Sequence, residues 1–292
     1  MKVVLTGSSS HLARALLPLL SADPAISRIT GIDLAPAVWH HHKYHHVRAD
    51  LAGLDPEHSL SDHDALIHMA WVVLRGRMSL ERMRHINLTL SQRWLQAAAG
   101  MERIVHLSSA SVYGQGLDLN ENAPLQPIPG FRYAEHKRDI DVWLASRLPQ
   151  AISLRPHIIL GPNAQPLLKR LLRLPAYIRL PDPQPLLQCV HETDVAHAIV
   201  QALKTPVSGA FNLAAPDTFN LRDVIRHNRP HAIGIPPALA AGSLTLLWRL
   251  SGAGGEPGWI RGADHSLTLD CSRAASKLGW QPRHDAASLV RV

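Results

Sequence analysis

The 292-residue sequence has little cysteine, few aromatic residues and no long hydrophobic run. Its two cysteines, Cys189 and Cys271, stand far apart with no partner at metal-ligand spacing. This argues against a disulfide scaffold and a zinc knuckle, and favours a reduced, cytoplasmic location. The longest uncharged run, residues 232–248, is broken by Pro236 and Pro237 and falls short of the roughly 20 residues that span a membrane. We interpret it as a loop leading into a buried helix, with a peripheral contact to anionic lipid as the alternative.

Charge and hydropathy narrow the class of protein further. Apolar residues make up 46% and charged residues 18%, with a mean hydropathy near zero, which excludes a disordered, fibrous or multi-span membrane chain. The chain opens on a buried-strand pattern, so we expect no export signal. The net charge is +7, yet no nucleic-acid-binding motif is present and no aromatic residues interleave the basic stretches. We therefore expect a small-molecule substrate and no nucleic-acid partner.

Short aliphatic runs alternate with helical patterns through the first half of the chain. The runs are residues 3–5, 29–32, 65–67, 104–107 and 152–154, and amphipathic stretches between them are 12–20, 88–99 and 134–148. Alternating strands and crossover helices predict an α/β fold with a doubly wound parallel sheet, the Rossmann type.

The character of the sequence changes after Gly161 and Pro162, where prolines break the regular alternation. We therefore predict two parts, of which the smaller is expected to close over the carboxyl ends of the strands. The two parts are a doubly wound domain of residues 1–160 plus 191–215 and a C-terminal lobe of residues 161–190 plus 216–292.

The first strand leads into a loop with the spacing of a phosphate-binding turn. The segment from Thr6 to Ala13 follows T-G-x-x-G-x-x-G, but only Gly7 is kept, and Ser10 and Ala13 take the other two places. A strand-to-helix turn of this kind presents backbone amides and a helix N-terminus to a pyrophosphate. An ordinary tight turn is the alternative interpretation.

Asp33 stands at the end of the second strand, 20 residues beyond Ala13. A carboxylate there accepts hydrogen bonds from the adenosine ribose hydroxyls and repels a 2′-phosphate. The loop and Asp33 together predict NAD rather than NADP as the cofactor.

A second group of residues indicates the chemistry. Ser109 follows the fifth strand, Tyr133 comes 24 residues later, and Lys137 lies four positions beyond it. A tyrosine and a lysine four apart share one helical face, so the ammonium favours the phenolate and can hold the nicotinamide ribose. The serine would orient the reacting oxygen. The trio suits proton transfer at a carbinol or carbonyl, coupled to hydride exchange with nicotinamide.

With these motifs the chain resembles the extended short-chain dehydrogenase/reductase family, in its NAD-dependent epimerase/dehydratase group, over nearly the whole length. Further matching segments are residues 67–70, Asn87, Leu154 to Pro162, Val190 to Ala196, Asp270 to Ala274 and Leu278 to Pro282. The resemblance implies a homodimer formed through a four-helix arrangement. It also implies that Tyr133 is the general acid/base, Lys137 its partner and Ser109 the hydroxyl that binds substrate. The implied cofactor contacts are Gly7, Ser10, His11, Leu12, Asp33, Asp50, Leu51, Met69, Ala70, Asn87, Tyr133, Lys137 and Pro156.

Two departures from the family pattern narrow the predicted reaction. The sugar dehydratases of the family follow the serine with Asp-Glu, whereas Ala110 and Ser111 follow it here, which argues against elimination. Nucleotide-sugar epimerases place an arginine that grips the substrate diphosphate where this chain has Leu187, four residues before His191. Four cations that would substitute for this arginine are Lys169, Arg170, Arg173 and Arg179. The alternative is that they are only solvated surface charges.

We expect an NAD-dependent enzyme that acts on a secondary alcohol or its ketone, with a sugar epimerase slightly favoured. A dehydrogenase or reductase of a non-nucleotide substrate, such as a hydroxysteroid-like or flavonoid-like alcohol, is the alternative. A non-catalytic NAD-binding regulatory protein is an alternative of another class, motivated by the missing loop glycines.

The histidine cluster between Trp39 and His46 invites a metal hypothesis, since imidazole is the commonest transition-metal ligand. Adjacent side chains on a loop or strand point in different directions, however, and no carboxylate or cysteine lies within the cluster. We therefore predict no metal site. His157 is expected either to face the nicotinamide pocket or to have a structural role.

Overall fold

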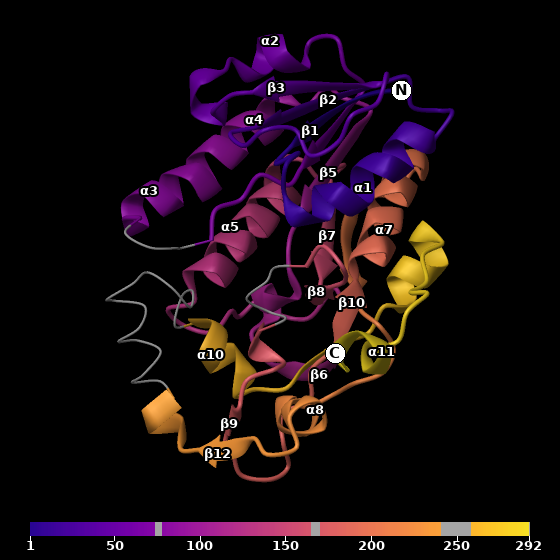
Figure 1. Ribbon diagram of the computed structural model, residues 1–292. Helices are drawn as coiled ribbons and strands as arrows, with labels where there is room; N and C mark the ends of the chain where they lie inside the picture. The colour runs from indigo at the N-terminus through magenta and orange to yellow at the C-terminus, as the bar shows by residue number, and fades with distance from the viewer. Residues whose placement is uncertain (74–77, 165–169, 241–257, 292) are drawn as a thin grey trace.

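A computed structural model describes residues 1–73, 78–164, 170–240 and 258–291. Its centre is a seven-stranded parallel sheet in the order β11-β7-β5-β4-β1-β2-β3 (Figure 1). The strands are β1 (Lys2–Thr6), β2 (Arg28–Asp33), β3 (Tyr44–Arg48), β4 (Ala65–His68), β5 (Arg103–Leu107), β7 (Ile152–Pro156) and β11 (Gly209–Leu213). The strand order reverses between β1 and β4, which confirms the predicted doubly wound α/β fold.

The central strands are apolar because helices cover both faces of the sheet. All four side chains of β4 are buried, and Val3, Val4 and Leu5 of β1 are fully buried. Near-continuous aliphatic runs are typical of parallel strands in this setting. Each of the five predicted strands forms at one of these runs.

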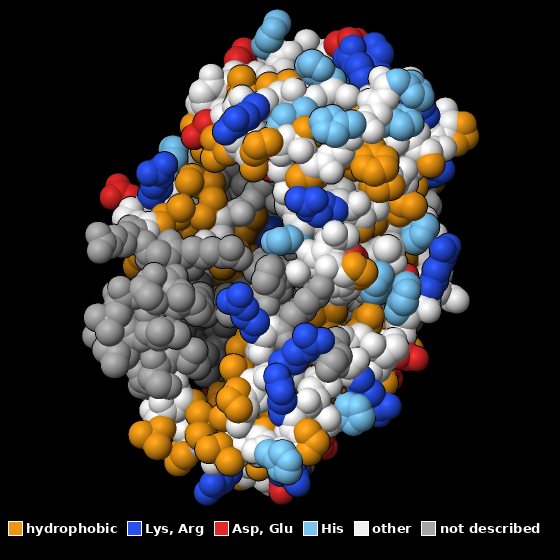
Figure 2. Space-filling model, in the orientation of Figure 1, with side chains coloured by type: hydrophobic (Ala, Val, Ile, Leu, Met, Phe, Trp, Pro, Cys, Tyr) orange, Lys and Arg blue, Asp and Glu red, His pale blue; other side chains and the backbone are white. Residues whose placement is uncertain are grey.

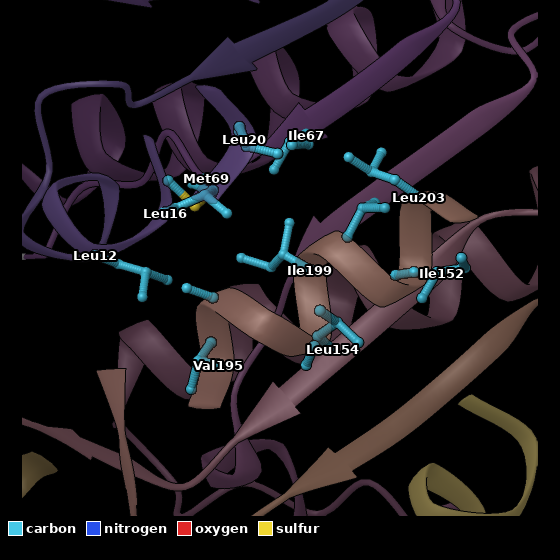
Figure 3. Packing of buried hydrophobic residues seen from close by; sticks show 14 of the residues in the cluster. Leu12, Leu16, Leu20, Ile67, Met69, Ile152, Leu154, Val195, Ile199 and Leu203 are labelled. Atoms are coloured by element: carbon cyan, nitrogen blue, oxygen red, sulfur yellow. The ribbon is translucent and has the colours of Figure 1, made fainter. Parts of the chain in front are cut away.

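Helices α1 (His11–Ala22) and α7 (Glu192–Lys204) pack against one another on one face of the sheet. Leucines of α1 and aliphatic residues of α7 meet over Ile67 of β4 and Leu154 of β7 (Figure 3). Burying one such side chain contributes roughly 1.5–3 kcal/mol. This layer therefore holds the first turn of α1 firmly against the carboxyl ends of the strands.

The opposite face of the sheet is covered by α4 (Ser91–Ala97) and α5 (Arg132–Arg147). Trp94 of α4 and Ile140 of α5 belong to the same buried cluster as Leu66 of β4. A π-helical segment joins α4 to α3, so the helix predicted from residue 88 begins earlier in the structure. The bounds are α2 (Pro56–Leu60), α3 (Leu80–Arg84) and the π-helical segment His85–Leu90.

A smaller lobe lies beyond the carboxyl ends of the central strands (Figure 1). In the described part of the chain it contains three two-stranded parallel sheets, and Leu160, Leu187, Phe219 and Leu267 belong to its core. The sheets pair β8 (Ile158–Leu160) with β10 (Cys189–His191), β9 (Ala176–Ile178) with β12 (Ile233–Ile235), and β6 (Gly116–Leu119) with β13 (Leu267–Leu269). The helices are α8 (Leu221–Asn228), α10 (Gly258–Ala263) and α11 (Ala286–Val290).

Among the strands that were not predicted, β3 and β6 lie in the first half of the chain. β3 lies inside the histidine-rich stretch, where the half-exposed residues of an edge strand carry no aliphatic run. β6 belongs in sequence to the predicted NAD-binding domain but pairs with β13 of the predicted lobe. The domain boundaries themselves stay a prediction.

The uncharged run 232–248 is described only in part. It begins with β12. The rest of the run, residues 241–248, where a buried helix was predicted, lies outside the described residues. In the described segments, no helix has the length and apolar character needed to cross a membrane. Both cysteines are free thiols, as predicted.

Candidate active site

The predicted site residues meet at one edge of the central sheet. Because parallel strands end on the same side, the residues that follow β1, β2, β4, β5 and β7 are brought to that edge. β1 pairs with β2 on one side and with β4 on the other. In doubly wound sheets, ligands bind in the crevice that forms at such a reversal of strand order.

Gly7 occupies a position that only glycine fits. Its φ is +75°, and a Cβ there would lie 2.7 Å from the backbone nitrogen of Ala70. The Gly7 amide also donates to the Ile32 carbonyl at 2.9 Å. The backbone turn thus closes directly against the end of β4, leaving a cradle free of side chains, as a bound pyrophosphate requires.

Ser10 caps the helix that follows this turn. Its hydroxyl accepts a hydrogen bond from the Ala13 amide at 3.3 Å, so the serine that replaces a glycine here has a structural role of its own. His11 is exposed at the start of α1, whereas the Leu12 side chain is buried in the core. Any contact of Leu12 with a dinucleotide would therefore use its backbone amide.

Asp33 lies beside the turn, as the sequence predicts. One carboxylate oxygen accepts from the Ser9 amide and the other from the Ala35 amide, each at 2.9 Å. Each oxygen keeps a lone pair for a ribose hydroxyl. The carboxylate and the Gly7 cradle fit a dinucleotide whose adenosine end lies over β2.

Asp50 and Leu51 follow β3. Asp50 is exposed, and its side chain caps the short turn that begins at Leu51 by accepting from the Ala52 amide at 2.9 Å. The exposed carboxylate sits one strand beyond Asp33. Its contact with the cofactor, which the family resemblance implies, stays a prediction.

Arg48 is a charged neighbour of Asp33 that the sequence analysis missed. The two residues are direct partners across the β2–β3 pair, and the Arg48 Nε donates to the Leu34 carbonyl at 3.1 Å. An arginine here can accommodate a 2′-phosphate. The sequence analysis did not place Arg48 beside Asp33 because β3 itself was not predicted.

Ser109 and Tyr133 are brought together by the ends of β5 and α5. Ser109 caps a short turn and accepts hydrogen bonds from the Ser111 amide at 3.2 Å and the Ser111 hydroxyl at 3.0 Å. Burial raises the pKa of Tyr133, and a hydrogen bond with the Ser109 side chain lowers it. The two hydroxyls therefore share one site, as the spacing predicted.

Lys137 is buried beneath the same site. Its ammonium donates to the Leu107 carbonyl at the end of β5, and burial lowers its pKa to about 7, with Asp141 acting in the opposite direction. The lysine can therefore exchange a proton near neutral pH. This departs from the simple expectation of a permanently charged ammonium beside the phenol.

Trp71 is a second residue that the sequence analysis missed. The Lys137 Nζ lies 3.6 Å from the centroid of its indole ring, and the ring meets Tyr133 edge-on at 6.4 Å between centroids. Trp71 follows Met69 and Ala70 directly, where two cofactor contacts were predicted. It therefore links the segment against which Gly7 packs to Tyr133 and Lys137.

Asn87 holds the segment that carries Trp71. Its side-chain oxygen accepts from the Val72 amide and its side-chain nitrogen donates to the Val72 carbonyl, both at 2.8 Å. The Asn87 side chain is fully buried. Its predicted cofactor contact would thus be indirect, through the backbone that it positions.

Pro156 ends β7 and is buried beside His157. The His157 Nε2 lies 3.0 Å from the Leu267 carbonyl, and its Nδ1 accepts from the Ile158 amide at 2.8 Å. Burial lowers the pKa of His157 to about 4. Both ring nitrogens contact the backbone of the fold. Of the two alternatives predicted for His157, the structure therefore favours the structural role.

Leu187 belongs to the core of the lobe. It exchanges backbone hydrogen bonds with Phe219 at 2.8 and 2.9 Å and is buried. Among the arginines considered as substitutes, Arg179 donates to the Gly234 carbonyl at 2.7 Å on the β9–β12 sheet. Lys169 lies outside the described residues.

The histidine cluster forms hydrogen bonds within the fold. The Nε2 of His46 lies 3.0 Å from the Ala35 carbonyl, and its Nδ1 lies 3.1 Å from the Tyr44 hydroxyl. Among the residues that the structure describes, no group of three or more His, Cys, Asp or Glu side chains could hold a metal ion.

Comparisons with known proteins show the family. A family model described as the NAD-dependent epimerase/dehydratase family matches residues 3–214, while no curated protein matches the sequence significantly. The chain is similar in structure to the UDP-glucuronic acid 4-epimerase from Bacillus cereus in complex with NAD. That match has a TM-score of 0.71 and 18% identity, and covers 100% of this chain and 96% of the other.

The chain is also similar to the UDP-glucose 4-epimerase from Thermotoga maritima with UDP-glucose. Here the TM-score is 0.74 at 16% identity, with 100% of this chain and 96% of the other covered. At these identities the structural matches establish the fold alone, and the family model establishes membership. The chain belongs to the NAD-dependent epimerase/dehydratase family, and it is an NAD-dependent enzyme.

Proposed function

We propose that this enzyme acts on a secondary alcohol or its ketone, and that its reaction is the epimerisation of a sugar-like substrate. The observation that carries the proposal is that Tyr133 bonds Ser109 and that Tyr133 and Lys137 both contact Trp71, the residue after the Ala70 against which Gly7 packs. When bound, NAD supplies the acceptor and the donor of the hydride. The chain's own residues then need only orient the substrate and move its proton.

Tyr133 is the proposed general base and acid. Its phenolate takes the proton of the substrate hydroxyl as that carbon is oxidised, and its phenol returns the proton when the ketone is reduced. Burial raises the pKa of Tyr133, and the hydrogen bond with Ser109 limits that rise, which helps the phenolate to form. Lys137, with its pKa near 7, can supply positive charge beside Tyr133 or release a proton at neutral pH.

A nucleotide sugar is the proposed substrate class. The support is the overall likeness to solved UDP-sugar epimerases, which extends over the full length of this chain. A non-nucleotide alcohol is the second candidate. Buried Leu187 favours it, because an aliphatic core residue stands where nucleotide-sugar epimerases use an arginine to bind the diphosphate.

The test is to incubate the purified enzyme with NAD and a panel of UDP-sugars and simple secondary alcohols. Absorbance at the NADH band and product stereochemistry are followed together. Inversion without NADH accumulation supports the epimerase, whereas NADH accumulation with an alcohol supports the dehydrogenase. Absence of both, with equal behaviour of Tyr133→Phe, would leave only a non-catalytic NAD-binding protein.

Cofactor selectivity gives an independent test of the adenosine site. We expect Asp33→Asn to bind NADP better relative to NAD, because the charge that repels a 2′-phosphate is gone. Arg48→Gln should act in the opposite direction. Isothermal titration of both variants with NAD and NADP measures the two ratios, and tighter binding of NADP by the unaltered enzyme would contradict the role of Asp33.

We further propose a cytoplasmic location and a homodimer. The two free thiols support the first. For the second, Val142 on the helix α5 is 55% exposed, as a residue covered by a partner copy would be. Sedimentation of the enzyme and of Val142→Glu measures the oligomeric state, and two monomeric species would contradict the homodimer.

A further inference from the structure

Two described segments at the far end of the small lobe carry positive charge and contain no carboxylate side chain. Residues 170–181 and 224–240, which we name the lobe tip, contain five arginines and no Asp or Glu. The adjoining acidic residues Asp182 and Asp223 both contact Arg222, at 3.0 and 3.5 Å. The positive charge of the tip is therefore available to an outside partner.

The two segments form one continuous surface. β9 and β12 pair in parallel, and α8 packs against β9 (Figure 1). The Arg179 guanidinium donates to the Gly234 carbonyl at 2.7 Å, and the Arg229 Nε donates to the Arg173 carbonyl at 3.4 Å. These contacts place arginines from both segments side by side.

Exposed aliphatic side chains lie among these arginines. Ile233 and Leu239 are each 66% exposed, and Leu171 and Leu174 are also exposed. Figure 2 shows hydrophobic side chains gathered at this end of the molecule, with Lys and Arg side chains beside them. Contiguous exposed apolar surface marks interaction sites on soluble domains.

This combination selects one kind of partner. A nucleic acid or an acidic protein would satisfy the arginines but would gain little from exposed aliphatic chains beside them. An anionic bilayer satisfies both, because its headgroups attract the cations while its acyl boundary accepts the apolar side chains. We propose that the lobe tip docks on anionic membrane surfaces, with arginine charge and aliphatic insertion acting together.

The experiment is flotation of the full-length protein with vesicles of two compositions. One set contains phosphatidylcholine alone and the other phosphatidylcholine mixed with phosphatidylglycerol. We expect binding to the mixed vesicles only, and weaker binding as salt is raised, because surface charges are screened. Equal binding to both sets, or to neither, would overturn the proposal. So would retention on heparin without vesicle binding, which would indicate a polyanion partner.

Two double variants separate charge from insertion. Arg173→Gln with Arg226→Gln should lower the vesicle partition coefficient about 25-fold, since one basic residue near an anionic surface contributes about five-fold. Ile233→Ser with Leu239→Ser should lower it while leaving its salt dependence intact. Both apolar residues are largely exposed, so the fold should persist, which circular dichroism checks.

The matched control lies on α3, α4 and α5, outside the small lobe. Arg93 and Arg147 are exposed on α4 and at the end of α5, and Leu80 is 52% exposed on α3. Arg93→Gln with Arg147→Gln, and separately Leu80→Ser, should bind mixed vesicles like the unaltered protein. Equal losses in these controls would show unspecific attraction and overturn the proposal. Because flotation needs neither substrate nor NAD, its outcome is independent of the proposed reaction.

Discussion

The indole ring of Trp71 lies over the ammonium of Lys137, with 3.6 Å between Nζ and the ring centroid. The Leu107 carbonyl accepts a hydrogen bond from the same ammonium, and burial lowers the pKa of Lys137 to about 7. Near neutral pH, the ring and the carbonyl therefore stabilise the charged side chain by direct contact, in addition to the charge of Asp141.

We expect Trp71→Leu to lower kcat/KM about 5- to 30-fold, because a desolvated cation–π contact contributes roughly 1–2 kcal/mol. Leucine keeps an apolar cover over Lys137 but has no π face. Trp71→Phe keeps an aromatic face and should retain most of the activity. Steady-state kinetics measure both, with Trp143→Leu on α5 as a control. Equal losses in the Leu and Phe variants would mean that ring volume, not the π face, is what Lys137 requires.

Lys137→Met should stabilise the protein near pH 7 while abolishing activity. The pKa of Lys137 is about 7 in the folded state against 10.5 ordinarily. Between these values the unfolded chain binds more protons, so stability rises with pH across this window and the burial cost is fully present below it. Removing the amine should raise the free energy of unfolding by about 2–4 kcal/mol at neutral pH.

Urea unfolding of Lys137→Met at neutral pH, and at a pH above the ordinary lysine pKa, checks this prediction. The gain in the free energy of unfolding should vanish at the higher pH. The exposed Lys277 gives a control, since Lys277→Met should change stability little at either pH. A Lys137→Met variant less stable than the unaltered protein at neutral pH would mean that the Leu107 hydrogen bond outweighs the cost of burial.

Much of the central sheet could be predicted because most of its strands are aliphatic runs in the sequence. The strands that contain Val3, Leu66 and Ile104 are covered by helices on both faces of the sheet. Their segments therefore contain few polar residues. β3 offered no such signal, since it lies at the sheet edge with half-exposed residues. The pairing of β6 with β13 joins residues about 150 positions apart, and no local pattern encodes such a contact.

The proposed catalytic residues Tyr133 and Lys137 could be predicted as a pair because a spacing of four places both on one face of a helix. Trp71 could not, because its contact with Lys137 joins the end of β4 to the face of α5 and depends on Asn87 holding Val72. The low pKa of Lys137 is likewise a product of burial. Spacing finds residues that share an element, while contacts between elements appear only in the fold.

Ser109→Ala should move the pH dependence of the reaction to higher pH. The Ser109 hydrogen bond lowers the pKa of Tyr133, so removing it raises that pKa and a higher pH is needed to form the phenolate base. We expect kcat/KM to fall about 10²-fold at neutral pH and to recover partly as pH rises. The pH profile measures this, and Ser146→Ala, at an exposed position on α5, is the control. A loss of kcat/KM that is the same at every pH would mean that Ser109 binds substrate without affecting the pKa of Tyr133.

Gly7→Ala tests the cofactor-binding turn. The φ of +75° costs an L-residue about 1–2 kcal/mol, and the added Cβ would lie 2.7 Å from the Ala70 nitrogen. We expect a lower melting temperature and NAD binding weakened at least ten-fold, because the backbone must move away from the pyrophosphate position.

Gly100→Ala is the matched control for Gly7→Ala. A Cβ at Gly100 would meet nothing within 4 Å, so melting temperature and NAD affinity should stay close to those of the unaltered enzyme. Thermal melts and NAD titration of the two variants separate the effect of the turn from that of losing any glycine. A Gly7→Ala variant that melts early but binds NAD with full affinity would show that the turn serves the fold alone, and the pyrophosphate would then have to lie elsewhere along the strand ends.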